Sequence, residues 1–405
     1  MMETIPFAVP YIGAEEEEAV LRVLRSGWLT TGPETQAFEQ EFAASLGVLP
    51  QQVLAVNSAT AGLHLALEAC GVRKGDLVFV PSYTFAASAE VVRYLQADIV
   101  FVDCAPGSFL MDIDKLEESI DRLSAGKRAY GWRGGAGPCA TPKVILPVHY
   151  AGLCCDMQSI NALAKRYRLR VVEDAAHAFP AYTVQGTPAG TQGDLGVFSF
   201  YATKPITTGE GGMIVCGTPA YAERIAIMRS HGIDRTVWNR YTDTKASWYY
   251  QVIDAGYKYN IPDILSALGR VQLSRAPALA ERRKKIAALY DAAFETDEHF
   301  IIPPTAPGDA RHLYPLRLCE PLDRDSFITD LKERGIGVSV HFIPLHTMPY
   351  YKKLYSLEDD DFPESYRNFR QEISLPIWPA MTDAQINRVI SCIQELAARH
   401  CSLHR

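Results

Sequence analysis

The chain has 405 residues, of which 48% are hydrophobic and 21% are charged, and its formal net charge is −7. This length exceeds what one hydrophobic core usually encloses, so we expect two domains, and the composition argues against a disordered chain. An acidic charge without a dense basic cluster argues against nucleic-acid binding. No apolar run approaches the ~20 residues that span a bilayer, and the N-terminus lacks a secretory signal, so we expect a cytoplasmic protein that makes no membrane contact.

The nine cysteines are odd in number and scattered, which indicates reduced thiols rather than a disulfide framework. Cys154 and Cys155 stand near His149 and Asp156, a set that suggests a metal site. Their spacing matches no established zinc pattern, and free cysteine is among the most buried residue types. We therefore interpret these cysteines as buried thiols and expect no metal.

The N-terminal part of the chain predicts alternating helices and strands. Apolar positions at helical spacing predict helix, loop and helix over 14–46, with the loop at 27–33. Strands are predicted at 53–56, 77–80, 99–102, 144–148, 170–172 and 197–201, with a helix at 61–70. This alternation is typical of a mainly parallel sheet covered on both faces, which is the α/β class. The Gly-rich, polar segment 122–141 predicts a surface loop.

The C-terminal part predicts a smaller α/β lobe. Helices are expected at 221–231, 262–273 and 278–294, and a proline-rich break follows at 303–307. Beyond the break we expect a strand at 313–318, a helix at 324–333, a strand at 338–342 and a helix at 383–398. We therefore predict a large domain over 1–285 and a small C-terminal domain over 286–405.

A carboxylate and a lysine stand just after two of the predicted strands. Asp174 follows the apolar run 169–172, and Lys204 follows 197–201 and precedes the Gly-rich turn at 209–212. Open α/β sheets bind ligands at the carboxyl ends of their strands. A surface salt bridge is the plainer interpretation of such a pair. The neighbouring small and hydroxyl side chains favour a pyridoxal 5′-phosphate (PLP) site, in which a lysine carries the cofactor and an Asp pairs with its pyridine nitrogen.

Several segments, in order along nearly the whole chain, carry a family resemblance. They are GWLTTGP (27–33), NSATAGLHLAL (57–67), PSYTF (81–85), EDAAHA (173–178), GDLGVFSF (193–200), TTGEGG (207–212), GYKYN (256–260) and VHFIPLH (340–346). Together they resemble the DegT/StrS family of nucleotide-sugar aminotransferases. The resemblance implies the fold-type I architecture of PLP enzymes, with a large domain and a smaller C-terminal α/β lobe.

The resemblance also implies roles for individual residues. Lys204 would carry the cofactor and move the proton, and Asp174 would keep the pyridine nitrogen protonated. Further cofactor contacts fall on Ala59, Thr60, Phe85, Ala176, His177, Ser199 and Asn260, and substrate contacts on Thr30, Thr31, His341 and His346. Plainer interpretations remain open for a helix N-cap at 58–60, a core aromatic at Phe85 and a structural histidine at His177.

The reaction implied by the resemblance is transfer of an amino group from L-glutamate, through pyridoxamine phosphate, to a nucleotide-linked keto sugar. VHFIPLH and GYKYN most resemble enzymes that make 4-amino sugars, including the UDP-4-amino-4-deoxy-arabinose type, and a 3-keto sugar is the alternative. Lys204 stands where related sugar 3-dehydratases have His, which favours transamination. Two other hypotheses are a PLP-fold sensor without turnover and a metal enzyme built on His149, Cys154 and Asp156.

The same resemblance predicts a homodimer. The Asn matching Asn260 reaches the cofactor phosphate of the neighbouring subunit in this family, so two sites would share one interface. An aromatic-rich stretch precedes it, with Trp238, Tyr241, Trp248, Tyr249 and Tyr250. So many aromatic side chains favour an interface over a monomer's surface, although a loop packed within one subunit is the plainer interpretation.

Overall fold

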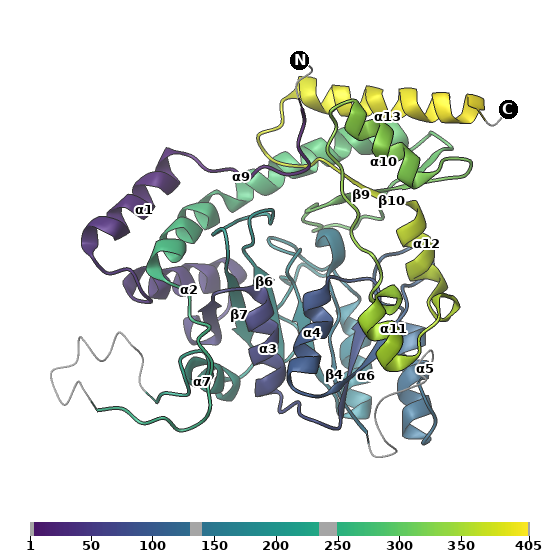
Figure 1. The fold of residues 1–405 in the computed structure, drawn as a ribbon. Coiled ribbons are helices and arrows are strands. Elements are labelled where there is room, and N and C mark those ends of the chain that lie inside the picture. The colour runs from purple at the N-terminus through teal and green to yellow at the C-terminus, as the bar shows by residue number, and fades with distance from the viewer. Residues whose placement is uncertain (1–3, 130–139, 235–248, 404–405) are drawn as a thin grey trace.

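A computed structural model describes residues 4–129, 140–234 and 249–403 (Figure 1). Its main sheet has the strand order β1-β7-β6-β5-β4-β2-β3. The strands are β1 (Val53–Val56), β2 (Asp76–Pro81), β3 (Asp98–Val102), β4 (Thr141–Ile145), β5 (Arg170–Asp174), β6 (Leu195–Ser199) and β7 (Gly212–Cys216). All pairs from β6 through β3 are parallel, and β7 runs antiparallel to β6 and β1. The predicted α/β class with a mainly parallel sheet is confirmed.

Helices cover both faces of this sheet, because neighbouring strand residues point to opposite sides. Val197 packs in a core with the helix α3, whereas Phe198 packs in another with Phe38 and Phe42 of α2. The helices of this part are α1 (Ala14–Ser26), α2 (Pro33–Leu46), α3 (Ala59–Ala69), α4 (Ala86–Tyr94), α5 (Ile113–Ser124), α6 (Met157–Tyr167) and α7 (Pro219–Met228). The predicted helix–loop–helix over 14–46 is present as α1 and α2.

A second sheet, in the order β10-β9-β8, forms the C-terminal lobe with its own core. Tyr314 and Leu316 of the sheet pack there with Phe327 and Ile386 of the covering helices, and Ile5 of the N-terminal segment joins them. The elements are β8 (Phe300–Ile301), β9 (Tyr314–Leu318), β10 (Glu372–Leu375), α10 (Arg324–Glu333), α11 (Pro349–Tyr355), α12 (Pro363–Gln371) and α13 (Asp383–Leu403).

One helix, α9 (Asp263–Phe294), links the two parts and corrects a prediction. Separate helices at 262–273 and 278–294 were expected. The helix instead continues through Pro277, with α1 and α2 packed along it and its last turns in the core of the lobe. Figure 1 shows it as one long ribbon. The domain boundary at residue 285 falls inside this helix and stays a prediction.

Two further predictions differ from the structure or lie outside it. The strand expected at 338–342 does not form, and Ser339 makes only a single bridge to Ser374, on the edge of β10 that β9 leaves free. The ladder ends there because the His341 N–H donates to the Glu372 side chain and not to a backbone carbonyl. Of the loop predicted at 122–141, residues 130–139 lie outside the described residues, as do Trp238, Tyr241 and Trp248. At its ends the prediction was wrong, because 122–124 belong to α5 and 141 begins β4. In the parts of the chain that the structure describes, every helix is too short or too polar to cross a membrane.

Candidate active site

A cavity of about 410 Å³ opens at the carboxyl ends of β5 and β6. It lies where open α/β sheets bind their ligands. The residues predicted from sequence that line it are Ala59, Thr60, Phe85, Asp174, Ala176, His177, Ser199, Lys204 and His341. The lining residues that sequence reasoning missed include Thr84, Ser88, Tyr201, Thr203, Glu210, His312 and Phe342. Side chains from distant parts of the chain therefore converge on one cavity.

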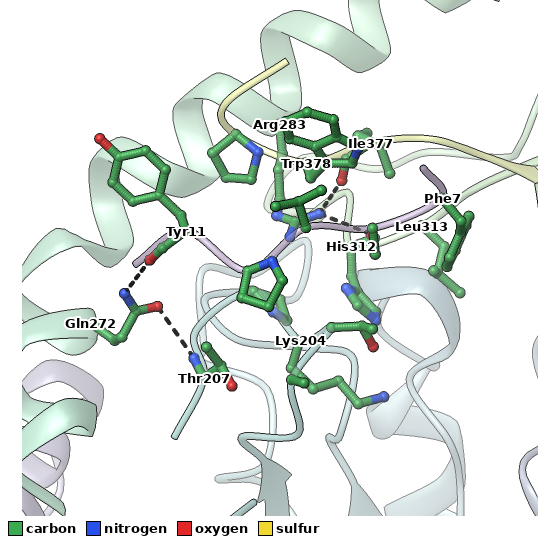
Figure 2. Close-up of a pocket in the computed structure, with 17 residues that line it drawn as sticks. Phe7, Tyr11, Lys204, Thr207, Gln272, Arg283, His312, Leu313, Ile377 and Trp378 are labelled. Carbon is green, nitrogen blue, oxygen red and sulfur yellow. Dashed lines mark hydrogen bonds between the residues drawn. The ribbon is translucent and has the colours of Figure 1, made fainter. Parts of the chain in front are cut away.

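Lys204 lies on a turn after β6, and its backbone N–H donates to the Tyr201 carbonyl at 2.9 Å. Figure 2 shows it below the segment carrying Phe7 and Tyr11, with its amino end turned away from Gln272. Burial lowers the pKa of the Lys204 amine to about 8, although the charge of Asp174 opposes the shift. About a tenth of this amine is therefore neutral, and nucleophilic, at pH 7, far more than of an ordinary lysine.

This shift predicts the pH dependence of aldehyde attachment. In cofactor-free protein, the rate at which Lys204 captures added pyridoxal 5′-phosphate should rise with pH through about 8 and then level off, because only the neutral amine attacks. An ordinary lysine, with a pKa of about 10.4, would give a rate that still rises between pH 9 and 10. Stopped-flow absorbance across this range measures it, and a rate with no plateau below pH 10 would contradict the lowered pKa.

Asp174 ends β5 and is 5% exposed. Its Oδ2 accepts from the Ser88 hydroxyl at 2.8 Å, and its Oδ1 accepts from the Ala176 N–H at 3.1 Å. Burial raises the pKa of the carboxyl, although these two hydrogen bonds and Lys204 counteract the shift. Within the described residues Asp174 forms no ion pair. A buried carboxylate at a cavity wall, without a cation on it, is suited to a cationic ligand group.

Ser88 supports Asp174 from α4, and the sequence analysis did not single it out. Its hydroxyl also lies 2.8 Å from the hydroxyl of Thr84, and both residues are buried. The signal was present in the sequence, since Thr84 and Ser88 stand one helical turn apart directly after β2. This small hydroxyl chain holds the carboxylate in place.

The first turn of α3 opens into the cavity through Ser58, Ala59 and Thr60. Ser58 caps the helix by accepting the Ala61 N–H at 3.1 Å, while other first-turn N–H groups have no partner within the helix. Gly212 lets β7 pass closely, because a Cβ there would lie 2.8 Å from the Ala59 nitrogen. Free N–H groups and the positive end of the helix dipole make this turn suited to an anion such as phosphate.

His177 has a defined tautomer. Its Nδ1 accepts the Ala151 N–H at 3.2 Å, so the neutral ring carries its proton on Nε2. Burial, with added repulsion from Lys204 and His341, holds the pKa of this histidine well below 6.5, so the ring is neutral. The ring stacks on Phe342, with 5.8 Å between centroids. His177 therefore offers the cavity a hydrogen-bond donor.

Three of the residues predicted to bind ligand lie together outside this cavity. The Asn260 amide donates to the Thr31 hydroxyl at 2.6 Å, and that hydroxyl donates to the Ile261 carbonyl at 2.5 Å. The Thr30 carbonyl accepts the Asp263 N–H at 3.3 Å. This cluster fixes the loop between α1 and α2 against the start of α9.

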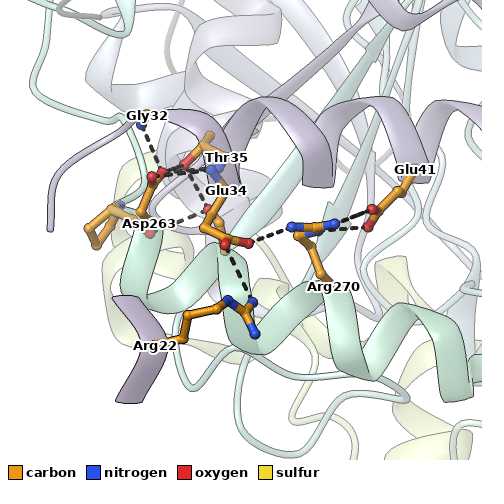
Figure 3. A network of polar contacts seen from close by, with 9 residues as sticks. Arg22, Gly32, Glu34, Thr35, Glu41, Asp263 and Arg270 are labelled. Carbon is orange, nitrogen blue, oxygen red and sulfur yellow. Dashed lines mark hydrogen bonds and ion pairs between the residues drawn. The ribbon is translucent and has the colours of Figure 1, made fainter. Parts of the chain in front are cut away.

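Asp263 holds the same loop by capping α2 (Figure 3). Its Oδ1 accepts from the N–H groups of Gly32, at 2.7 Å, and Thr35, at 3.0 Å, and from the Thr35 hydroxyl at 2.7 Å. Arg270, about two turns further along the same face of α9, pairs with Glu41 of α2. The loop that carries Thr30 and Thr31 is therefore rigidly positioned, and its proposed ligand contacts stay predictions.

His346 also lies away from the cavity. It is fully buried, its Nδ1 is 2.5 Å from the Ser82 hydroxyl, and its ring stacks on Phe362. Within this chain its surroundings are those of a core histidine, so the structure does not bring it to the predicted substrate site. His341, in the same motif, does line the cavity.

The alternative metal set is not assembled. Within the described residues, no group of three or more His, Cys, Asp or Glu side chains is arranged to hold a metal ion. The His149 ring is used otherwise, since its Nδ1 accepts the Cys155 N–H at 3.1 Å and its Nε2 lies 2.8 Å from Glu173. The hypothesis of a metal enzyme built on His149, Cys154 and Asp156 therefore has no geometric support.

A nucleophilic amine, a buried carboxylate and an anion-binding helix start surround one cavity. These groups fit the aldehyde, the pyridine nitrogen and the phosphate of pyridoxal 5′-phosphate, and Phe85 and Ala176 offer walls for a flat ring. Fold and site therefore define the class of PLP-dependent enzymes with a large domain and a C-terminal lobe.

Comparison with known proteins gives the family. The model of the DegT/DnrJ/EryC1/StrS aminotransferase family matches residues 10–394, and the chain belongs to this family. It is therefore an aminotransferase, and the cofactor of the family is PLP. The expected family, fold class, enzyme class and cofactor are confirmed.

Individual relatives match nearly the whole chain. The spore coat polysaccharide biosynthesis protein SpsC of Bacillus subtilis is 39% identical over 97% of both chains. Spr1654 from Streptococcus pneumoniae, solved in a PLP-form, has a TM-score of 0.86 and 30% identity, and the match covers 98% of this chain and 99% of that one. The sugar aminotransferase CalS13 from Micromonospora echinospora has a TM-score of 0.80 and 26% identity over 96% and 99% of the two chains.

Proposed function

We propose that this enzyme transfers an amino group from L-glutamate to the keto carbon of a nucleotide-linked sugar, and that the keto group is at C4. The observation that carries the proposal is the convergence of Lys204 and Asp174 on one cavity inside a whole-chain family match. The sugar substrate is supported by relatives named for polysaccharide biosynthesis and for sugar amination. The cytoplasm, expected from the sequence, stays the proposed location.

The residues around the cavity have complementary tasks in this reaction. Bound PLP would supply an electron sink. Lys204 would hold its aldehyde and afterwards carry a proton to and from the reacting carbon, a task suited to an amine with a pKa of about 8. Asp174 would hold a proton on the pyridine nitrogen. The α3 turn and Ser199 would bind phosphate, and the Nε2–H of His177 would face an acceptor on the ring.

Two alternative functions, a 3-keto sugar aminotransferase and a sensor without turnover, can be separated from the proposal by experiment. A 3-keto sugar would use the same residues, and a sensor without turnover would need neither an amine of lowered pKa nor a carboxylate facing the cavity. A panel of UDP-, dTDP- and GDP-linked 3- and 4-keto sugars, assayed with glutamate, separates them. Turnover with one 4-keto sugar supports the proposal. Turnover only with a 3-keto sugar, or none with any sugar despite bound cofactor, would overturn it.

We also propose a homodimer in which Asn260 completes the phosphate site of the partner subunit. Asn260 lies outside its own cavity but bridges to Val56, just before the first turn of α3. Asn260→Ala should weaken PLP retention about 10-fold or more, because one hydrogen bond to a dianion is lost. Equilibrium dialysis of the cofactor measures this change.

Subunit mixing tests the shared site directly. When Lys204→Ala dimers and Asn260→Ala dimers are mixed and exchange subunits, the heterodimers that form should be active. Each heterodimer would contain one intact site, with Lys204 from one subunit and Asn260 from the other. Thr31→Ala is the matched control, since it breaks the hydrogen bond of Asn260 within its own chain and should leave PLP retention near wild type. A monomer by sedimentation, or no regained activity despite proven exchange, would refute the shared site.

A further inference from the structure

His341 is connected on the side away from the cavity to a buried carboxyl group. It lines the cavity, while its Nδ1 lies 2.8 Å from the Ser374 hydroxyl. That hydroxyl lies 2.5 Å from Oε1 of Glu372, and Oε2 of Glu372 accepts the backbone N–H of His341 at 2.9 Å. Glu372 and Ser374 are neighbours on one face of β10. Carboxyl, hydroxyl and imidazole thus form one continuous line that ends at the cavity.

The inner end of this line is sealed from water. Glu372 and Ser374 are both 0% exposed. Within the described residues no ion pair reaches the Glu372 carboxyl. Arg324, whose charge acts on this carboxyl, lies with one guanidinium nitrogen 3.4 Å from the Glu372 backbone carbonyl. A buried carboxyl without a counter-ion binds a proton more readily than an exposed one.

Other ionisable groups face the line from the elements packed around it. Tyr83 and Tyr150 lie on the large-domain side, and each has its pKa raised in part by Glu372. Arg317 is opposite Glu372 in the β9–β10 register, but its guanidinium binds Asn368 and the Gly107 carbonyl. Lys204 faces His341 across the cavity. Of the three residues in the line, Glu372 is therefore the one whose charge acts on the surrounding tyrosines.

Burial raises the pKa of Glu372 to about 8, although Ser374, His341 and Arg324 counteract the shift. Burial and Lys204 lower the pKa of His341 to about 4, so its ring is neutral. At neutral pH the line therefore holds a neutral imidazole and a carboxyl that exchanges its proton. Both forms of the carboxyl are accessible near pH 8.

Two arrangements of protons satisfy every hydrogen bond in the line. When Glu372 is ionised, Ser374 donates to it and His341 Nδ1–H donates to Ser374, so Nε2 is left as a bare acceptor. When Glu372 is protonated, it donates to Ser374, which donates to Nδ1, and the ring proton sits on Nε2. The charge of a buried carboxyl thus decides whether His341 accepts or donates.

We propose that Glu372, Ser374 and His341 form a proton relay for the carbonyl oxygen of the sugar substrate, with His341 Nε2 as the group that contacts this oxygen. The proposal rests on the proposed function. The oxygen of a ketone that exchanges for an amine leaves as water and must gain protons. His341 Nε2–H gives one, Nδ1 takes the Ser374 proton, and Ser374 takes the Glu372 proton. The incoming amine nitrogen loses two protons, and the bare Nε2 takes them one at a time, so the reverse sequence restores the starting state after each. The relay thus delivers two protons to the oxygen, which leaves as water, and no electrons are transferred.

The relay complements Lys204 and does not duplicate it. Lys204 serves the proton on carbon, whereas His341 would serve the oxygen. Ser374 and Glu372 are positioning residues, because they act only through the imidazole. A separate acid for the oxygen spares Lys204 from exchanging two protons at two atoms.

Nuclear magnetic resonance of ¹⁵N-histidine in the full-length protein, with cofactor bound and without it, tests the relay. His341→Gln assigns the resonances. In the wild type, the protonated nitrogen of His341 should change from Nε2 to Nδ1 as the pH rises through about 8. Glu372→Gln should lock the proton on Nε2 at every pH, because the amide oxygen is needed to accept the His341 backbone N–H and the NH2 group then faces Ser374 as a donor. A tautomer that is independent of pH and unchanged in Glu372→Gln would overturn the relay, whether or not a sugar substrate is known.

Activity provides the second measurement. Ser374→Ala should lower kcat for the sugar about 10²-fold with little change in KM, as expected for loss of general acid–base assistance. Ser339→Ala, which removes a hydroxyl from the segment paired with Ser374, should leave kcat unchanged. Glu372→Gln should also flatten the pH profile near 8. Wild-type kcat in Ser374→Ala and Glu372→Gln, measured on a sugar that the wild type converts, would reject the relay while leaving the proposed function in place.

Discussion

Lys204→Ala should abolish covalent attachment of the cofactor and lower amino transfer about 10⁴-fold or more, because one side chain both holds the aldehyde and moves the proton. The fold should survive. Burial lowers the pKa of this amine to about 8, so at pH 7 the charged form is less favourable in the folded chain than in the unfolded one. Removing it should therefore not destabilise the protein at that pH.

Absorbance in the near-ultraviolet to visible range, and mass spectrometry after borohydride reduction, report the attachment. Lys204→Arg keeps a cation but supplies no amine that condenses with an aldehyde, so it should be equally inactive. Lys285→Ala, at an exposed position on α9, is the matched control and should behave as wild type. A kcat near wild type in Lys204→Ala would show that another group carries the chemistry.

Six of the seven strands of the main sheet were predicted from sequence, because such strands are buried on both faces. The strand β7 was not predicted, although it is equally buried. β1, β2, β6 and β7 have every residue buried, and such strands appear as continuous apolar runs. The small lobe was less predictable. Its edge strand β8 has two residues, too few to show a pattern. The segment 338–342 has a strand-like sequence, but its pairing with the outer edge of β10 ends after one bridge, because the Glu372 side chain takes the His341 N–H.

The continuity of α9 also depends on tertiary contacts. Proline costs about 3 kcal/mol inside a helix, so local propensity predicts a break near Pro277. Both halves of α9 are buried against other elements, α1 and α2 at one end and the lobe core at the other. Packing over 32 residues outweighs one lost hydrogen bond, and no local rule contains that information.

The site was predictable where motifs follow strand ends, as with Asp174 and Lys204. It was not predictable where distant loops close over the cavity. His312 packs 4.6 Å from His177, centroid to centroid, yet lies in an irregular segment without a motif. In VHFIPLH, sequence spacing does not decide which histidine faces the cavity. The fold turns His341 toward it and buries His346 beside Ser82.

Glu173 and Asp174 are adjacent on β5 but point to opposite faces of the sheet, so a substitution at one is a control for a substitution at the other. Glu173 is 0% exposed and accepts the backbone N–H groups of Gly190, Gln192 and Gly193 in addition to its contact with His149. Its carboxylate therefore binds the loop 190–193 and is not available to a ligand. Asp174 points to the other face and into the cavity, where two hydrogen bonds leave its charge available to a ligand.

Asp174→Asn should fold and bind PLP but lose about 10²- to 10³-fold in kcat, the range for removing one electrostatic partner of developing charge. The fold should tolerate the change, because the Ser88 hydroxyl can accept from the new amide and donate to Thr84. An amide cannot stabilise a protonated pyridine nitrogen, so the cofactor should also absorb at a different wavelength. Glu173→Gln should do the reverse, lowering the free energy of unfolding by about 2–4 kcal/mol with the cofactor spectrum unchanged. If Asp174→Asn stayed within a few fold of wild type, Asp174 would not be the partner of the pyridine nitrogen.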